Sequence, residues 1–256
     1  MPDDPLVGGA AAWMPRVMAG IGRDLTDEQQ LACALRHLDD VGFCENLTGH
    51  ITWQRRGDNT MLVNPWGLWW AETKASDILT ISESGDVLAG RWDVTPAFHI
   101  HTELHRRRSD ARVVVHNHPM YATILCGIGI LPEIIHQNSS MFFDDMVFIN
   151  EYEGEIASAD AGAALADRVG EASVALLANH GVLVMAATIE EATYKAANLE
   201  RCCEIMYKTM LTGRKPLALD PSVMKPMKAS LIERATFAYW DGAVRQLIAK
   251  EPEVLG

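Results

Sequence analysis

The chain has 256 residues, of which 48% are hydrophobic, so it is long enough to bury a sizeable core without disulfide bonds. Its formal net charge of −12 argues against nucleic acid or an anionic membrane surface as a partner, because such partners require a basic surface. Five cysteines without a C-x-x-C pair indicate reduced thiols and a cytoplasmic location. The expected partner is a small-molecule substrate or another protein.

The organisation along the chain indicates one domain preceded by an arm. No internal repeat or low-complexity segment is visible, and proline and glycine are scattered rather than gathered in a linker. We therefore expect an N-terminal arm over 1–25 and one domain over 26–256. The first residues are acidic and lack the basic start and apolar centre of a signal peptide, which agrees with a cytoplasmic location.

The first part of this domain predicts a helix and then a meandering sheet. Thr26 and Gln29 form a capping-box pattern ahead of a helix over 27–41, which Gly42 ends. Three strand-like stretches follow, separated by glycine, aspartate and asparagine turns: 49–54, 60–64 and 86–89.

The rest of the chain alternates helices with strands. Pro96 fits the first position of a helix that runs to Arg108. The further expected elements are a buried strand over 111–116, a helix after Pro119, two apolar strand-like runs within 174–187, a long helix over 189–212 and a helix within 226–249. This alternation predicts a layered α/β fold.

Two of the nine histidines stand one residue apart where the buried strand ends. Side chains two apart on a strand point to the same face, so His116 and His118 can converge on one ion. His180, at another strand end and followed by glycine, is the candidate third ligand, because catalytic metal sites commonly take three protein ligands. The alternative is that these histidines only make hydrogen bonds in ordinary packing.

A second histidine pair lies on the predicted helix that starts near Pro96. His101 and His105 are four residues apart and share one face of that helix, a geometry that can also bind metal. The stretch HTELH is not the zinc motif H-E-x-x-H, however, because no acid directly follows the first histidine. We expect this pair to pack against the site, with a metal contact as the alternative.

Four short stretches, GHIT, NPWG, VVHNHP and ANHGVLV, occur in this order and resemble the class II aldolase/adducin family over roughly residues 27 to 212. The resemblance implies a single three-layer α/β/α domain around a largely antiparallel sheet. It implies one divalent ion per chain, with zinc as the first expectation and manganese or iron as alternatives, bound by His116, His118 and His180. It also implies a homotetramer with its sites at subunit interfaces.

The sequence departs from the sugar-phosphate aldolases of that family. Those enzymes carry a proton-transferring glutamate where counting back from His118 finds Ala97, and alanine cannot move a proton. The family's phosphate-binding positions hold Thr95 and Pro96, and His50 replaces an asparagine. Because a phosphate site prefers backbone donors and small polar side chains, a sugar phosphate is not the expected substrate.

Aromatic residues replace these polar features. The stretch PWGLWW places Trp66, Trp69 and Trp70 in the loop that borders the substrate by resemblance. They pack in the core or at an interface, or at least one forms a flat wall for a planar or aromatic acid. The predicted substrate-binding residues are Asn64, Trp66, Gly67 and Thr95, with Asn64 and Gly67 as hydrogen-bond donors to a carboxylate.

Four residues are candidates for proton transfer. His136 falls near the position of a tyrosine that, in the family, donates a proton from the neighbouring subunit, and an imidazole can serve as that acid. Tyr239 is placed by the resemblance in a C-terminal segment that closes over a neighbour's site. His50 and His101 are the candidate bases if the reaction is an aldol cleavage.

The sequence favours a metal-dependent carbon–carbon lyase, and in particular a decarboxylase of a hydroxylated aromatic or other planar carboxylic acid. A bound ion would stabilise the negative charge left when carbon dioxide departs, so no proton-abstracting carboxylate is needed. The alternatives are an aldolase acting on a non-phosphorylated substrate, an Fe(II)-dependent oxygenase and a non-catalytic, adducin-like scaffold.

Overall fold

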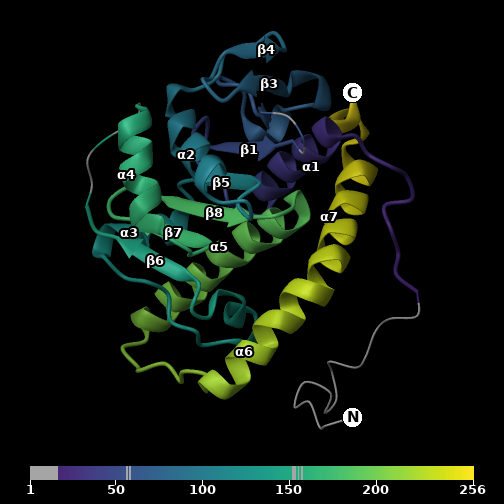
Figure 1. Ribbon diagram of the computed structural model, residues 1–256. Coiled ribbons are helices and arrows are strands. Elements are labelled where there is room, and N and C mark those ends of the chain that lie inside the picture. Colours follow the sequence, from purple (N-terminus) through teal and green to yellow (C-terminus); the bar gives the residue numbers. More distant parts are fainter. Residues whose placement is uncertain (1–16, 56, 58, 152–153, 155, 157) are drawn as a thin grey trace, which may run out of the picture.

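An eight-stranded sheet forms the middle layer of the computed structural model, which describes residues 17–55, 57, 59–151, 154, 156 and 158–256 (Figure 1). The strands lie in the order β4 (Val87–Ala89), β3 (Leu79–Ser82), β2 (Thr60–Val63), β1 (His50–Gln54), β5 (Val113–Asn117), β8 (Val182–Ala186), β7 (Val174–Leu177) and β6 (Met146–Ile149). Neighbouring strands are antiparallel, except for the parallel pair β6 and β7. This confirms the predicted α/β class with a largely antiparallel sheet.

The central strands are buried on both faces, so successive side chains enter two different cores. Val113 and Val115 of β5 pack into one core, whereas Val114 between them packs into the other. On β8, Val184 and Leu183 divide in the same way. Strands covered on both faces read as nearly continuous apolar runs, which is the pattern of 111–116 and 182–186.

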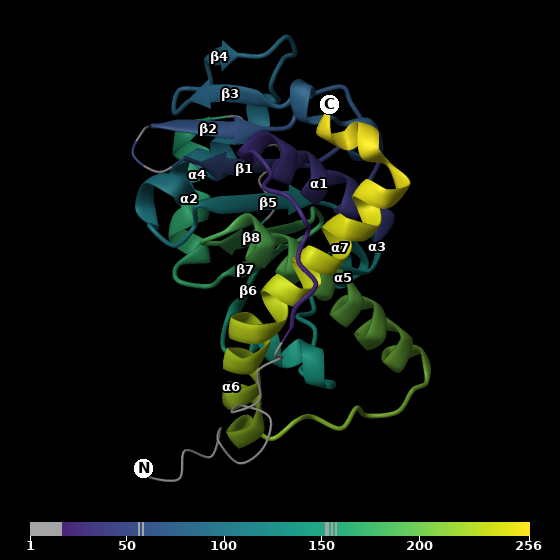
Figure 2. The same cartoon turned by 90° about the vertical axis from the view of Figure 1, so that its right-hand side faces the viewer.

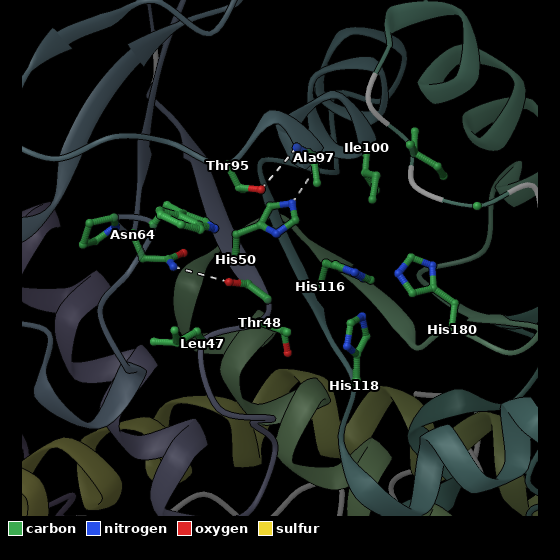
Figure 3. Close-up of a pocket in the computed structure, with 15 residues that line it drawn as sticks. Leu47, Thr48, His50, Asn64, Thr95, Ala97, Ile100, His116, His118 and His180 are labelled. Carbon is green, nitrogen blue, oxygen red and sulfur yellow. Dashed lines mark hydrogen bonds between the residues drawn. The ribbon is translucent and has the colours of Figure 1, made fainter.

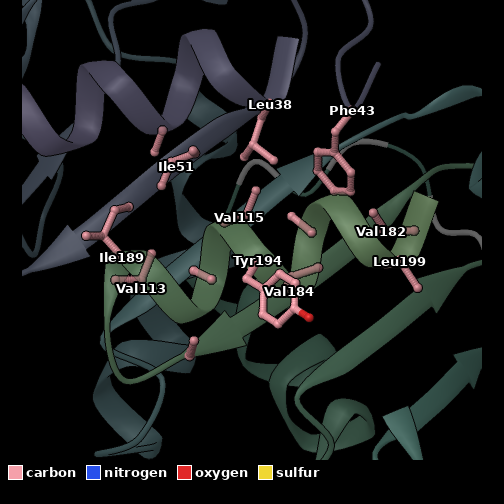
Figure 4. Close-up of a cluster of buried hydrophobic side chains, with 14 of the residues drawn as sticks. Leu38, Phe43, Ile51, Val113, Val115, Val182, Val184, Ile189, Tyr194 and Leu199 are labelled. Atoms are coloured by element: carbon pink, nitrogen blue, oxygen red, sulfur yellow. The ribbon is translucent and has the colours of Figure 1, made fainter. Parts of the chain in front are cut away.

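Helices cover both faces of the sheet and make the three layers (Figure 2). The larger core lies under α1 (Asp27–Asp40), α3 (Met120–Ile128), α5 (Ile189–Leu211) and α7 (Thr236–Lys250). Figure 4 shows part of it, including Leu38 of α1, Val115 of β5 and, near Val182, Leu199 of α5. The smaller core lies under α2 (His99–Arg107) and α4 (Ala159–Val169), where Ile100 and Leu165 meet the strands.

Helix α1 begins and ends where its sequence signals predict. The Thr26 hydroxyl accepts from the Gln29 N–H at 3.3 Å, and the Gln29 side chain accepts from the Thr26 N–H at 3.1 Å. Gly42, two residues after the helix, has φ +81°, a conformation that glycine adopts without strain. The described part of the predicted arm, 17–25, contains no helix or strand, and residues 1–16 lie outside the described residues.

Several elements were not predicted from the sequence. These are β3, β6, α4 and the helix α6 (Pro221–Ser230). Strand β6 is only four residues long and mostly half-buried, and the buried face of α4 includes the small residues Gly162 and Ala166, so neither stands out as an apolar pattern in the sequence. The single helix expected within 226–249 is instead α6 joined to α7 through a π-helical turn, Leu231–Ala235. Within the described residues, no helix combines the length and the apolar character needed to span a membrane.

Candidate active site

Three histidines converge at one end of the central strands (Figure 3). His116 lies on β5, His118 follows the end of that strand, and His180 lies in the turn between β7 and β8. One ring nitrogen from each lies within 4.8 Å of those of the other two. The sheet causes this convergence, since Asn117 pairs with Val182 and brings the end of β5 beside that turn.

The turn that carries His180 depends on two unusual backbone positions. Asn179 has φ 53°, in the left-handed region that asparagine tolerates better than most residues. Gly181 lies so close to the strand end that an added Cβ would stand 2.4 Å from Cδ2 of His118 and 2.5 Å from the Asn117 carbonyl oxygen. Only glycine therefore lets the two ligand-bearing segments approach this closely.

Hydrogen bonds fix which ring nitrogen of each strand-end histidine is free to bind an ion. Nδ1 of His116 donates to the Val182 carbonyl at 2.9 Å, because a carbonyl can only accept. Nδ1 of His118 faces Oε2 of Glu45 at 3.0 Å. Nε2 of His118 is buried and has no hydrogen-bond partner among the described atoms. A buried nitrogen lone pair without a donor fits a metal ligand with an oriented outer partner.

The electrostatics of His116 and His180 also suit a divalent ion. Burial lowers the pKa of His180 to about 4, and it lowers the pKa of His116 well below the usual range. Neutral rings are the form that binds metal, so little proton release is required at neutral pH. The residues present therefore fit a divalent ion.

Glu45 is a site residue that the sequence analysis missed. It lies 73 residues before His118 in the chain, in the loop that follows α1, and no spacing pattern links the two. Only the packing of that loop against the end of β5 brings them together.

Removing the Glu45 carboxylate is expected to weaken metal binding about 10–100-fold, the usual cost of losing an outer partner of a metal ligand. The test is Glu45→Gln, with Zn²⁺ affinity measured by competition with a chelating dye. Glu83→Gln, in the exposed turn before β4, is the control and should change nothing. Equal affinities for wild type and Glu45→Gln would contradict a role for this carboxylate.

A cavity of about 490 Å³ opens beside the three histidines. Its described lining contains no aspartate, glutamate, lysine or arginine. The lining residues are Leu47, Thr48, Gly49, His50, Asn64, Pro65, Trp66, Thr95, Ala97, Ile100, His116, His118, Gly154, Ile156 and His180. A cavity with this lining suits a largely apolar, uncharged body attached to a group that binds an ion.

Three of the four predicted substrate-binding residues line the cavity. Trp66 and Thr95 line it, and the Trp66 side chain is 60% exposed. Asn64 also lines it, but its side-chain oxygen accepts from the Ile51 N–H at 2.8 Å and its amide group donates to a backbone carbonyl. Gly67 is not among the lining residues.

The other two tryptophans of the loop lie elsewhere. Trp70 is fully buried in the larger core, as one interpretation of the sequence expected. Trp69 is 48% exposed and does not line the cavity.

His50 belongs to a stack of buried histidines behind the metal ligands. Its Nε2 donates to the Ala97 carbonyl at 3.3 Å, and its ring stacks on His101 with 4.2 Å between centroids. His50 lines the cavity, whereas His101 is fully buried behind it. Burial lowers the pKa of His50 to about 4, so this ring is neutral at physiological pH.

His101 and His105, both on α2, contact the same hydroxyl group, that of Thr52. His105 Nδ1 donates to the Ala111 carbonyl at 2.6 Å, so its Nε2 accepts from the Thr52 hydroxyl at 2.6 Å. The Thr52 oxygen in turn accepts from Nδ1 of His101 at 2.7 Å. Neither histidine belongs to the group of possible metal ligands among the described residues, which agrees with the packing interpretation.

The last two candidates for proton transfer lie away from this cavity. His136 precedes the 3-10 helix Gln137–Phe142, and its backbone N–H donates to Ser139. Tyr239 on α7 contacts Nε2 of His37 through its hydroxyl at 2.7 Å and packs against Tyr194. Neither lines the cavity of its own chain, and their contact with a neighbour's site stays a prediction.

Comparison with known proteins gives consistent matches. Residues 29–207 match the family model "Class II Aldolase and Adducin N-terminal domain". Decarboxylase NovR of Streptomyces niveus is 27% identical over 187 residues, which cover 72% of this chain and 69% of that protein. A 5-deoxy-D-ribulose 1-phosphate aldolase of Bacillus thuringiensis is 29% identical over 192 residues, which cover 75% of this chain and 89% of that protein. In fold, the chain is similar to L-fuculose 1-phosphate aldolase from Glaciozyma antarctica, with a TM-score of 0.79, 21% identity and coverage of 95% and 97% of the two chains.

Proposed function

The chain belongs to the class II aldolase and adducin family, and from this premise we propose that it is a metal-dependent decarboxylase of a hydroxylated aromatic or other planar carboxylic acid. The observation that carries the proposal is the composition of the cavity. Three histidines stand beside an apolar wall, and the lining includes Ala97, where the family resemblance places the aldolase glutamate. A named decarboxylase and a named aldolase match at similar identity, 27% and 29%, so the choice between the two reactions rests on the cavity.

His116, His118 and His180 would hold one divalent ion, with zinc as the first expectation and manganese or iron as alternatives. Such an ion supplies a Lewis acid that stabilises the negative charge that develops as the carbon–carbon bond to the carboxylate breaks. Carbon dioxide leaves, and the carbon that keeps the electron pair takes one proton. This reaction requires a proton donor, but it requires no base that removes a proton from carbon.

The walls of the cavity select the body of the substrate. Trp66, Leu47 and Ile100 offer apolar surface to a flat ring. The described lining has no cationic side chain, so it offers no counterion to a phosphate group. An aromatic acid therefore fits this cavity better than a sugar phosphate.

His50 would bind a hydroxyl group of the substrate. Because its Nε2 donates to the Ala97 carbonyl, its other nitrogen, Nδ1, carries a lone pair in the neutral ring. Figure 3 shows the His50 ring between Asn64 and His116, at the wall of the cavity. A hydroxyl on the ring of the substrate would donate to this nitrogen.

The proton that the carbon takes would come from water or from a neighbouring subunit. We propose a homotetramer with its sites at subunit interfaces, as the family resemblance implies. His136 and Tyr239 of a neighbouring subunit are then the candidates that complete the site.

The decisive experiment offers the protein a panel of hydroxylated aromatic acids with Zn²⁺, Mn²⁺ or Fe²⁺ and measures carbon dioxide, aldehyde and oxygen uptake together. We expect carbon dioxide release without oxygen uptake. Aldol cleavage of a non-phosphorylated substrate without carbon dioxide would instead make the chain an aldolase, in which His50 is the base that lines the cavity. Oxygen uptake only with iron would make it an oxygenase.

Replacing the aromatic wall is expected to lower kcat/KM for an aromatic acid about 5-fold, since a ring contact contributes about 1 kcal/mol. The variant is Trp66→Ala, and steady-state kinetics give the ratio. Trp69→Ala is the matched control, because it removes an exposed indole of the same loop that does not line the cavity. Equal losses in both variants would show that the loop, rather than a contact with the substrate, sets the rate.

A further inference from the structure

A carboxylate from a distant helix holds the first turn of α3, which begins two residues after His118. Pro119 precedes this helix and provides no side-chain cap. The backbone N–H groups of Tyr121 and Ala122 donate instead to the two carboxylate oxygens of Glu200, at 2.8 and 3.0 Å. Glu200 lies on α5 and is 7% exposed. The first N–H groups of a helix have no partner within it, so a buried carboxylate anchors them strongly.

The far end of α3 holds the turn that carries His180. The Asn179 N–H donates to the Cys126 carbonyl at 3.3 Å, and the Cys126 thiol donates to the Gly181 carbonyl at 3.3 Å. Helix α3 therefore starts next to His118 and, at its other end, contacts Asn179 and Gly181, the two residues on either side of His180.

His118 depends on this helix because it lies beyond the sheet. The last residue of β5 in the ladder is Asn117, which pairs with Val182. The His118 N–H donates to the Asn117 side chain at 2.7 Å rather than to another strand. The position of His118 is thus set by β5 on one side and by the first turn of α3 on the other.

We propose that Glu200 is a positioning residue for the metal centre: by fixing α3 against α5, it sets where His118 lies relative to His180 and so raises the affinity for the ion. This inference rests on the proposed metal centre. Burial raises the pKa of Glu200 to about 7, while its two backbone donors oppose that shift. The experiment is therefore run at pH 8, where the carboxylate is ionised.

The test compares Glu200→Gln with Glu204→Gln, one turn further along α5. Glutamine keeps the size of the side chain but has one acceptor oxygen, so its amide group faces a backbone N–H. Glu204 pairs only with the exposed side chains of Arg201 and Lys208 in the described contacts. With Zn²⁺ and a competing chelating dye, we expect affinity to fall 10–100-fold in Glu200→Gln and less than 2-fold in Glu204→Gln.

Hydrogen exchange of the metal-free protein over residues 117–122 provides a second readout. We expect faster exchange there in Glu200→Gln than in wild type or Glu204→Gln. Unchanged Zn²⁺ affinity with a lower melting temperature would overturn the inference, because Glu200 would then support the fold alone. A wild-type protein that binds no Zn²⁺ would overturn the metal centre itself and with it this role, and the exchange data would still report whether Glu200 holds the turn.

Discussion

Replacing His116 or His180 with alanine is expected to abolish metal binding and decarboxylation together. The wild-type protein, purified without added metal, should carry about one divalent ion per chain, and each variant should carry none. Two imidazole ligands hold an ion much more weakly than three. The loss of metal affinity should therefore exceed the 10–100-fold effect of removing an outer partner such as Glu45. Mass spectrometry of the metal content makes this measurement, and the identity of the ion directs the activity search toward lyases for zinc or manganese and toward oxygenases for iron.

The matched control for this prediction is a histidine that lies outside the site. His99→Ala removes a half-buried imidazole from the start of α2 and should leave the metal content unchanged. An ion retained in full by His180→Ala would contradict the three-ligand centre. A wild-type protein that stays free of metal even after reconstitution would favour the adducin-like scaffold.

Acid is expected to destabilise the protein strongly through its buried histidines. Burial lowers the pKa of His105 to about 4, compared with an ordinary value of 6.5. Between these values the unfolded chain binds the proton and the folded chain does not, so the free energy of unfolding falls as the pH drops through this window. At pH 5 the loss from His105 is about 2 kcal/mol. His101, whose pKa burial lowers further, adds to it in the same direction.

Urea unfolding at pH 7 and pH 5, with a chelator present to remove metal effects, tests this prediction. In His105→Gln the difference between the two pH values should shrink by about 2 kcal/mol, because one proton-binding group is missing. An undiminished difference in His105→Gln would mean that the acid sensitivity arises elsewhere.

The strand-end histidines could be predicted because their signals are local. Two side chains two apart on a strand share a face whatever the rest of the fold does, and the apolar runs around His116 and His180 mark the strands on their own. The capping box at Thr26 is equally local, and the structure places its helix within one residue of the prediction. The metal-binding role of the three histidines stays a prediction until the ion is measured.

The surroundings of these histidines could not be predicted in the same way. Glu45 reaches His118 only through the path of a loop, and Thr52 of strand β1 links His101 to His105 of helix α2. Asn64 was expected to offer hydrogen bonds to a substrate, but the backbone around β1 already uses its side chain. Contacts between distant segments depend on how the layers pack, and a spacing pattern does not contain that information.

The three ligand histidines come from the ends of β5 and β7 and the segments next to them, whereas Leu47, Trp66 and Ile156 come from connecting segments around the cavity. The ligands of the ion and these wall positions therefore lie on separate parts of the chain, although Glu45, which contacts His118, stands in the same loop as Leu47. A library that varies only these three wall positions should change which acid the protein accepts while every member still binds the ion. The same separation gives a lineage of such proteins a short route to new substrates, because selection can act on the wall without rebuilding the centre.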